Sequence, residues 1–104
     1  HADEQPRLLA AIGDKDVVIL RHHGLLVLGP TIEKAFFDLW TLQRACDVQC
    51  GADAAAGTTA PLPQAVIEKT ARDCVVFDPA GKAARLVFDA MVRRVASFDA
   101  SFRD

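Results

Sequence analysis

The stretch that decides the fold runs Val17-Val-Ile-Leu-Arg-His-His-Gly-Leu-Leu-Val-Leu28. It holds two runs of apolar residues, separated by Arg21, two histidines and Gly24. β-branched residues favour strands, and so short a connection has no room for a helix. Because Gly24 permits a sharp turn, the stretch predicts a tight hairpin, with one long strand bent at Gly24 as the alternative. Strands that are apolar at every position are typical of burial on both faces.

Helical patterns flank this stretch. Thr31 is a good N-cap, and no Gly or Pro interrupts the chain from Ile32 to about Cys50, which predicts one long helix. Its apolar sector, widened by Phe37 and Trp40, exceeds what one sheet contact requires and hints at a subunit interface. The sequence thus predicts an α/β chain of two strands and about four helices. The other helices are expected over 3–12, 63–72 and 82–98, with a flexible loop over 51–63.

Length and composition limit the possible classes of protein. The 104 residues carry 12 basic and 14 acidic side chains, a net charge of −2, and are 51% hydrophobic. These values fit one globular domain and exclude a disordered chain. We expect no nucleic-acid partner because no basic excess exists, and no membrane partner because no apolar run approaches the ~20 residues that span a bilayer. The three cysteines are odd in number and not densely spaced, which is unlike a disulfide framework, so we expect a reduced, cytoplasmic compartment.

The two strands need more structure than this sequence supplies. Two strands make a poor sheet by themselves, and strands buried on both faces require neighbours. The chain also begins at His1, and its one methionine is Met91. We therefore expect residues 1–104 to be the C-terminal part of a single larger α/β domain whose N-terminal half is absent.

The histidine pair at the predicted turn is the main candidate for chemistry. Imidazole is the commonest metal ligand near neutral pH, and strand ends often carry functional groups in α/β folds. Adjacent strand residues point to opposite faces, so at most one of His22 and His23 faces a given pocket. Spacing alone favours two ordinary turn residues, because a zinc site needs three or four ligands. Cys46 and Cys50 lie one helical turn apart but have no partners at zinc-finger spacing.

The stretch from Val18 to Phe36 resembles the class II aldolase/adducin family. The family pattern there is a strand, Arg-Asn-His-Gly, a second strand, Gly-x-Thr, and a helix with Ala-Phe and Glu-Arg-Ala-Cys-x-x-Gln. The resemblance continues in Leu42-Gln-Arg-Ala-Cys-Asp-Val-Gln49, where Gln43 replaces the family's Glu. The tail from Val92 to Arg103 is similar to the family's closing Leu-Arg-x-Leu-Asp segment.

The resemblance implies a fold, an assembly and a metal ligand. The implied fold is a three-layer α/β/α sandwich, present here as a C-terminal fragment and commonly assembled as a homo-oligomer, a tetramer. Family enzymes bind Zn2+ or another divalent metal through three histidines, and the third of these positions matches His23. His22 stands where the family usually has Asn, so its role stays open, and no residue is assigned as catalytic.

The implied function is part of a divalent-metal-dependent, aldolase-like lyase that acts through an enediolate on a small hydroxy-carbonyl, sugar-phosphate-like substrate. Related enzymes use this chemistry for epimerisation, dehydration or decarboxylation. The other two histidines and the general base are absent, so the fragment alone is not expected to be active. Phe102 stands where some family aldolases use a Tyr, which argues against simple aldol cleavage of a sugar phosphate. The alternative is a non-catalytic, adducin-like association domain.

Overall fold

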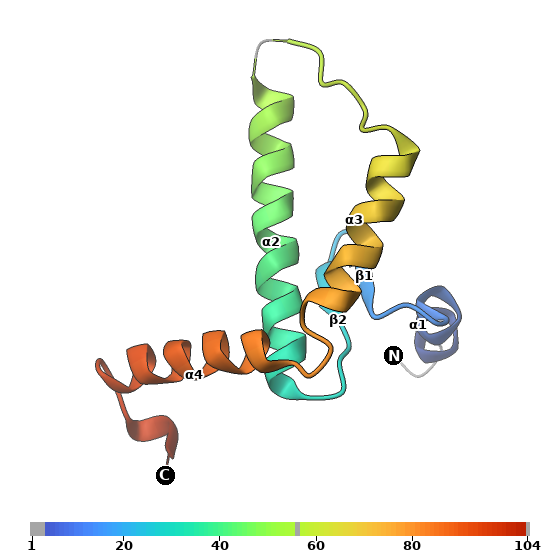
Figure 1. The fold of residues 1–104 in the computed structure, drawn as a ribbon. Coiled ribbons are helices and arrows are strands. Elements are labelled where there is room, and N and C mark those ends of the chain that lie inside the picture. The colour runs from blue at the N-terminus through green and yellow to red at the C-terminus, as the bar shows by residue number, and fades with distance from the viewer. Residues whose placement is uncertain (1–3, 56, 104) are drawn as a thin grey trace.

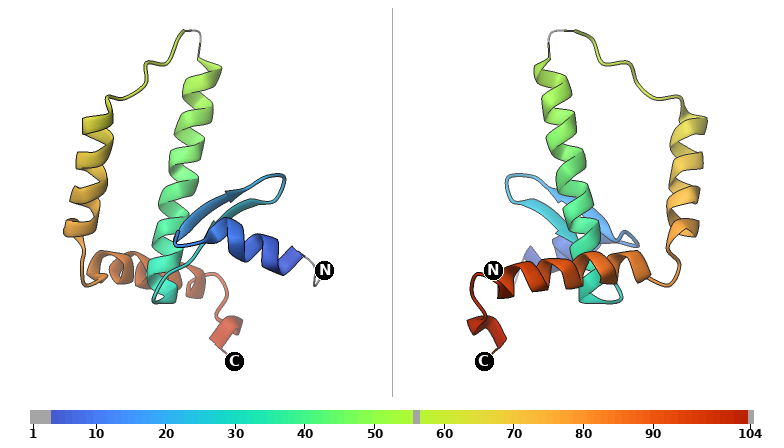
Figure 2. Two further views of the ribbon diagram at one scale, coloured as in Figure 1. Left: turned by 90° about the vertical axis from the view of Figure 1, so that its right-hand side faces the viewer. Right: turned by 60° about the vertical axis from the view of Figure 1, so that its left-hand side comes forward.

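The structure, a computed structural model, describes residues 4–55 and 57–103. The long helix α2 is its axis: a two-stranded hairpin lies against it and α4 crosses its N-terminal end, whereas α1 and α3 extend outward (Figures 1 and 2). Within the described residues, the expected two strands and four helices are confirmed, although Asp3, the expected start of the first helix, lies outside them. The elements are α1 (Glu4–Ile12), β1 (Val17–Leu20), β2 (Gly24–Val27), α2 (Ile32–Ala54), α3 (Gln64–Phe77), α4 (Lys82–Ala96) and the short 3-10 helix η1 (Ser101–Arg103).

The strands β1 and β2 form an antiparallel hairpin, in which Val17 faces Val27 and Leu20 faces Gly24. This pairing confirms the hairpin and rules out the single bent strand. The expectation that both strands are buried on both faces is wrong for this chain. Residues along β1 alternate between exposed and half-buried, and 65% of Ile19 is exposed. The physical reason is that β2 packs against α2, while the opposite face of this two-stranded sheet is open.

Helix α2 begins at the predicted cap and ends later than predicted. The Thr31 hydroxyl oxygen accepts a hydrogen bond from the backbone N–H of Lys34 at 3.2 Å. The helix continues past Cys50 to Ala54, so Gly51 lies inside it and the following loop is shorter than expected. A glycine costs only about 1 kcal/mol in a helix interior. A side-chain hydrogen bond of 2.8 Å from Gln49 to Asp53 spans this turn and offsets part of that cost.

Helix α3 also exceeds its predicted length and takes in the apolar segment Cys74–Phe77. It carries an ion pair of 2.5 Å between Lys69 and Asp73, one helical turn apart. Asp78, which directly follows α3, caps the next helix. Its carboxylate accepts hydrogen bonds from the first backbone N–H groups of α4, which begins at Lys82 as expected.

Helix α4 packs across α2 through a small contact. Ala84 is 1% exposed there, and the Phe88 ring meets the Phe36 ring edge to face at 5.4 Å between centroids. The apolar face of α4 is only partly covered, because Leu86 is 70% and Val95 51% exposed. These two side chains do not share in the contact that α4 makes with α2.

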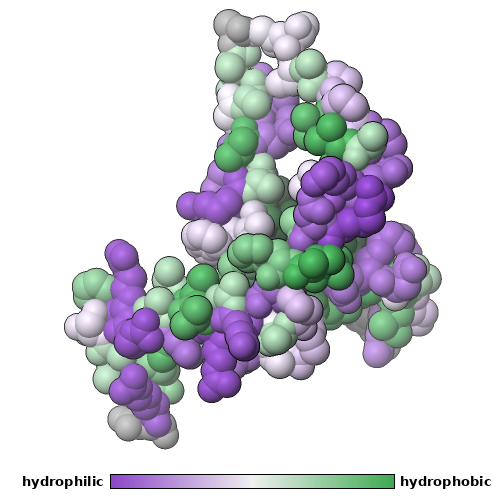
Figure 3. Space-filling model, viewed as in Figure 1, coloured by the Kyte–Doolittle hydropathy of each residue, from purple (hydrophilic) through white to green (hydrophobic). Residues whose placement is uncertain are grey.

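The described residues form an open scaffold with little core. The radius of gyration is 17.0 Å, whereas a compact domain of this length measures about 13 Å. The accessible surface is 8860 Å², against about 5,700 Å² for a compact monomer of this mass. Ile12 and Ala84 are the buried apolar residues of the described chain, and Figure 3 shows apolar side chains at the surface near the end of α3 and along α4. No helix in the described part of the chain has both the length and the apolar character to cross a membrane.

Candidate functional site

The histidine pair occupies the turn between β1 and β2, and both side chains are exposed. The backbone N–H of His23 donates to the carbonyl oxygen of Leu20 at 3.2 Å, which closes a four-residue turn. His22, the third residue of that turn, has a φ of 64°, and Gly24 has a φ of 112°. In a type II turn the third residue has a positive φ and the second residue does not. We expected Gly24 to provide the sharp turn, whereas in the structure both His22 and Gly24 have a positive φ.

The His23 ring is held by the turn itself. Its Nδ1 atom lies 3.2 Å from the carbonyl oxygen of Arg21. Because a carbonyl oxygen only accepts hydrogen bonds, Nδ1 is the nitrogen that carries the proton in this contact. The lone pair of the neutral ring is then on Nε2. Metal-binding histidines are commonly held in this way, with one ring nitrogen bonded to a carbonyl group and the other bound to the cation.

The turn presents one imidazole that suits a metal ion, but it does not form a complete metal site. Across residues 4–55 and 57–103, no three or more His, Cys, Asp or Glu side chains are placed to hold a metal ion. A zinc site requires three or four protein ligands, and the donor set around His23 is a single imidazole with His22 beside it in the chain. Cys46, Cys50 and Cys74 are free thiols on α2 and α3.

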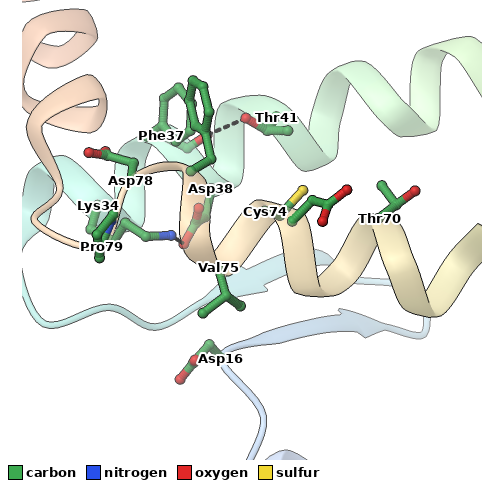
Figure 4. Close-up of a pocket in the computed structure, with 12 residues that line it drawn as sticks. Asp16, Lys34, Phe37, Asp38, Thr41, Thr70, Cys74, Val75, Asp78 and Pro79 are labelled. Carbon is green, nitrogen blue, oxygen red and sulfur yellow. Dashed lines mark hydrogen bonds and ion pairs between the residues drawn. The ribbon is translucent and has the colours of Figure 1, made fainter.

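A second candidate site is a cleft of about 850 Å³ between α2 and α3 (Figure 4). Phe37 from α2 and Val75 and Phe77 from α3 contribute its apolar lining. Val75 and Phe77 are each more than 70% exposed, because α3 does not pack closely on α2. This cleft was not predicted from the sequence, because the helix from residue 63 was expected to end before Val75 and Phe77.

Three of the four carboxyl groups that line this cleft are paired within the chain, and Asp16 is the fourth. Asp38 forms an ion pair with Lys34 on α2, and Asp73 is paired along α3. The Asp78 carboxylate accepts hydrogen bonds from the first backbone N–H groups of α4. A recess with an apolar wall and mostly paired charges suits the side chains of a packed protein segment better than a charged small substrate.

Two exposed carboxyl groups titrate below their ordinary range. The pKa of Glu33 is lowered mainly by a hydrogen bond from its own backbone amide, and further by the Thr31 hydroxyl. The pKa of Asp99 is lowered by hydrogen bonds from Ser101, whose backbone N–H lies 2.8 Å from the carboxylate. A lowered pKa makes a carboxyl group a poor general base at neutral pH. Neither group lines the histidine turn or the cleft, so no catalytic residue is assigned among them.

Comparison with known proteins relates the chain to one family. The sequence model of the family described as Class II Aldolase and Adducin N-terminal domain matches residues 2–50. A Pseudomonas aeruginosa protein, provisionally named an aldolase class 2 protein, is 32% identical over 104 residues, which cover 97% of this chain and 40% of that protein. A similarly named Caulobacter vibrioides protein is 36% identical over 49 residues, 47% of this chain and 19% of that protein. Beta-adducin of Rattus norvegicus is 46% identical over 46 residues, 44% of this chain and 6% of that protein.

The family match covers the region that contains the hairpin. The family match includes the turn with His22 and His23 and most of α2, and the match to the Pseudomonas protein extends over nearly the whole chain. The chain spans 40% of the length of that relative. No solved structure shows a significant match.

Proposed function

This chain belongs to the class II aldolase/adducin family, and we propose that it contributes one metal ligand, His23, to a divalent-metal-dependent lyase of that family. The lyase acts through an enediolate on a small hydroxy-carbonyl, sugar-phosphate-like substrate, or uses that chemistry for epimerisation, dehydration or decarboxylation. One observation carries the proposal. The residue that matches the family's third histidine has Nδ1 bonded to a backbone carbonyl, which leaves Nε2 as its metal-binding nitrogen.

In this proposal, the hairpin turn holds the metal ligand that this chain contributes. Backbone contacts hold His23 at its main chain, through the Leu20 carbonyl, and at its ring, through the Arg21 carbonyl. The paired strands fix the turn, because β2 packs on α2. A bound divalent cation such as Zn2+ supplies Lewis-acid stabilisation for the negative charge that develops on a hydroxy-carbonyl substrate. The remaining ligands and the general base are proposed to come from outside the described residues.

The open scaffold supports a larger assembly around this turn. We propose that residues 1–104 form the C-terminal part of a three-layer α/β/α domain in a cytoplasmic homo-oligomer, with a tetramer as the expected form. Ile19 on the open sheet face is 65% exposed and Trp40 on α2 is 44% exposed. The surface exceeds that of a compact monomer by about 3,000 Å². Burial of these faces against the rest of a domain and against other subunits accounts for that excess.

Deuterium exchange tests the reaction class. Enzymes that pass through an enediolate remove a proton from carbon, so the intact protein in D2O is mixed with small α-hydroxy ketones and their phosphates, and C–H loss is followed by proton NMR. We expect exchange that stops on His23→Ala or on chelation and returns when Zn2+ is added to the wild type. Arg93→Ala, at an exposed position on α4, is the control and should retain exchange. Exchange that persists in His23→Ala would contradict the proposal.

A second candidate function is a non-catalytic association domain of the adducin type. The observation that favours it is the 46% identity to beta-adducin over 46 residues, against 32% to the Pseudomonas protein over 104 residues. In that case His23 is only a turn residue and the apolar faces make protein contacts. A protein that binds no metal, and whose oligomeric state is the same in His23→Ala, would favour this function.

A further inference from the structure

His22 holds a backbone conformation that most residues avoid. Its φ of 64° makes it the one non-glycine residue with a positive φ between residues 4 and 103, residue 56 excepted. The left-handed region crowds the Cβ of an L-residue, and apart from glycine it is entered most readily by Asn, Asp and His. Such conformations persist where the surrounding structure requires them, often at functional sites. Position 22 therefore requires a particular backbone, whatever its side chain does.

The backbone of His22 controls where the carbonyl group of Arg21 points. That carbonyl belongs to the peptide unit that joins Arg21 to His22, which is the central unit of the turn. Type I and type II turns differ by a flip of this unit, and only the type II form has a positive φ at the third residue. In the observed turn the Arg21 carbonyl oxygen lies 3.2 Å from Nδ1 of His23. A residue that favours negative φ at position 22 would turn the carbonyl away from the ring.

We propose that His22 is a positioning residue for His23 and acts through its left-handed backbone, not through its ring. This inference rests on the proposed role of His23 as a metal ligand. The Arg21 carbonyl keeps the ring proton on Nδ1 and so leaves Nε2 available for the cation. Without that contact both neutral tautomers are populated and the ring rotates more freely, so a smaller fraction of His23 is ready to bind. Asn or Gly should replace His22 without loss, because both adopt the same backbone.

Substitutions that separate the backbone from the ring test this inference. In the intact protein, His22→Asn and His22→Gly allow a positive φ but remove the imidazole, whereas His22→Val keeps neither. Competition with a chromophoric chelator measures the affinity for Zn2+. We expect His22→Asn and His22→Gly to stay within about threefold of the wild type and His22→Val to bind about 10- to 100-fold more weakly. If circular dichroism shows that His22→Val is unfolded, the less crowded His22→Ala takes its place, with a loss in the same direction.

The tautomer of His23 gives a readout that needs no metal. Long-range proton–nitrogen NMR should find the proton on Nδ1 in the wild type, His22→Asn and His22→Gly, and a mixture of tautomers in His22→Val. If Zn2+ does not bind the wild type but the tautomer responds as expected, the metal role of His23 fails and the positioning of its ring by residue 22 stands. A His22→Gly variant that keeps the tautomer but binds Zn2+ at least about tenfold more weakly would make the His22 ring a ligand and overturn the inference. A His22→Val variant that matches the wild type in both measurements would also overturn it.

Discussion

The Asp78 carboxylate is expected to hold the first turn of α4 in place, so that Asp78→Ala loosens it. Its oxygens accept hydrogen bonds from the backbone N–H groups of Lys82 at 2.8 Å, Ala83 at 2.9 Å and Ala84 at 3.3 Å. Gly81 precedes the helix and provides no side-chain cap. Loss of a capping side chain costs about 0.5–2 kcal/mol, and loss of a favourable charge at a helix N-terminus about 0.3–1 kcal/mol. We therefore expect α4 to lose about 1–2 kcal/mol of local stability.

Hydrogen exchange of the intact protein, measured by mass spectrometry on peptides from the start of α4, checks this expectation. A loss of about 1–2 kcal/mol makes the affected amides exchange about 5- to 30-fold faster. Asp73→Ala is the matched control, because the Asp73 carboxylate is exposed on α3 and its ion pair with Lys69 is worth only about 0.3–0.5 kcal/mol. Exchange in α4 that is the same in Asp78→Ala, Asp73→Ala and the wild type would refute the capping role.

Three further changes test packing and charge. Gly29→Ala should lower the thermal midpoint, since the added Cβ would lie 3.0 Å from the backbone nitrogen of Ala35, an overpacking of about 1–3 kcal/mol. Gly51→Ala is its control and should stabilise α2 by about 1 kcal/mol, because nothing lies within 4 Å of the added Cβ. Ala84→Leu should push α4 away from α2 and speed amide exchange in both helices, because Ala84 is 1% exposed. Because the pKa of Glu33 is lowered in the folded protein, its carboxylate adds stability above its unfolded pKa, near 4.5. This stability is lost as the pH falls through the lower folded pKa, so the wild type should lose more stability in acid than Glu33→Gln, which acid unfolding of both proteins measures.

Each of these expectations can fail on a single observation. A Gly29→Ala variant as stable as the wild type would mean that the chain after β2 moves to accommodate the Cβ. Unchanged exchange in Ala84→Leu would place α4 further from α2 than the structure has it. Identical acid unfolding of the wild type and Glu33→Gln would show that the carboxylate is not preferentially held in its ionised form.

Local patterns in the sequence were enough to predict the hairpin and the helix starts. The polar turn at 21–24 and the Thr31 cap act over a few residues, so their outcome depends little on the rest of the chain. Helix ends were predicted less well. Gly51 was assigned to a loop, and the helix from residue 63 was expected to end near residue 72. Side-chain pairs across single helical turns accompany the continuation of these helices to Ala54 and Phe77. Burial on both strand faces was also wrong, because burial depends on neighbours that this chain does not place there.

Of the candidate site, only His23 was predicted from the sequence. The resemblance to the family pointed to His23, and the structure adds the contact between its Nδ1 atom and the Arg21 carbonyl oxygen. The positive φ of His22 could not be read from the sequence, since a histidine pair before a glycine is compatible with several turn types. The Asp78 cap had a signal in the sequence, an acidic residue shortly before the helix expected from residue 82, but it was not among the predicted caps. Among the described residues, no further ligands for the proposed metal lie beside the turn, so residue spacing around His23 could not reveal a complete site.

The metal content of the purified intact protein is the most direct test of the account. Elemental analysis by plasma mass spectrometry after dialysis should find about one divalent metal ion per subunit in the wild type. That metal should be absent from His23→Ala and retained in His22→Asn, with the same circular dichroism spectrum in all three proteins. A wild type that binds no divalent metal after incubation with Zn2+, or a folded His23→Ala variant with its metal content unchanged, would contradict the proposed role of His23.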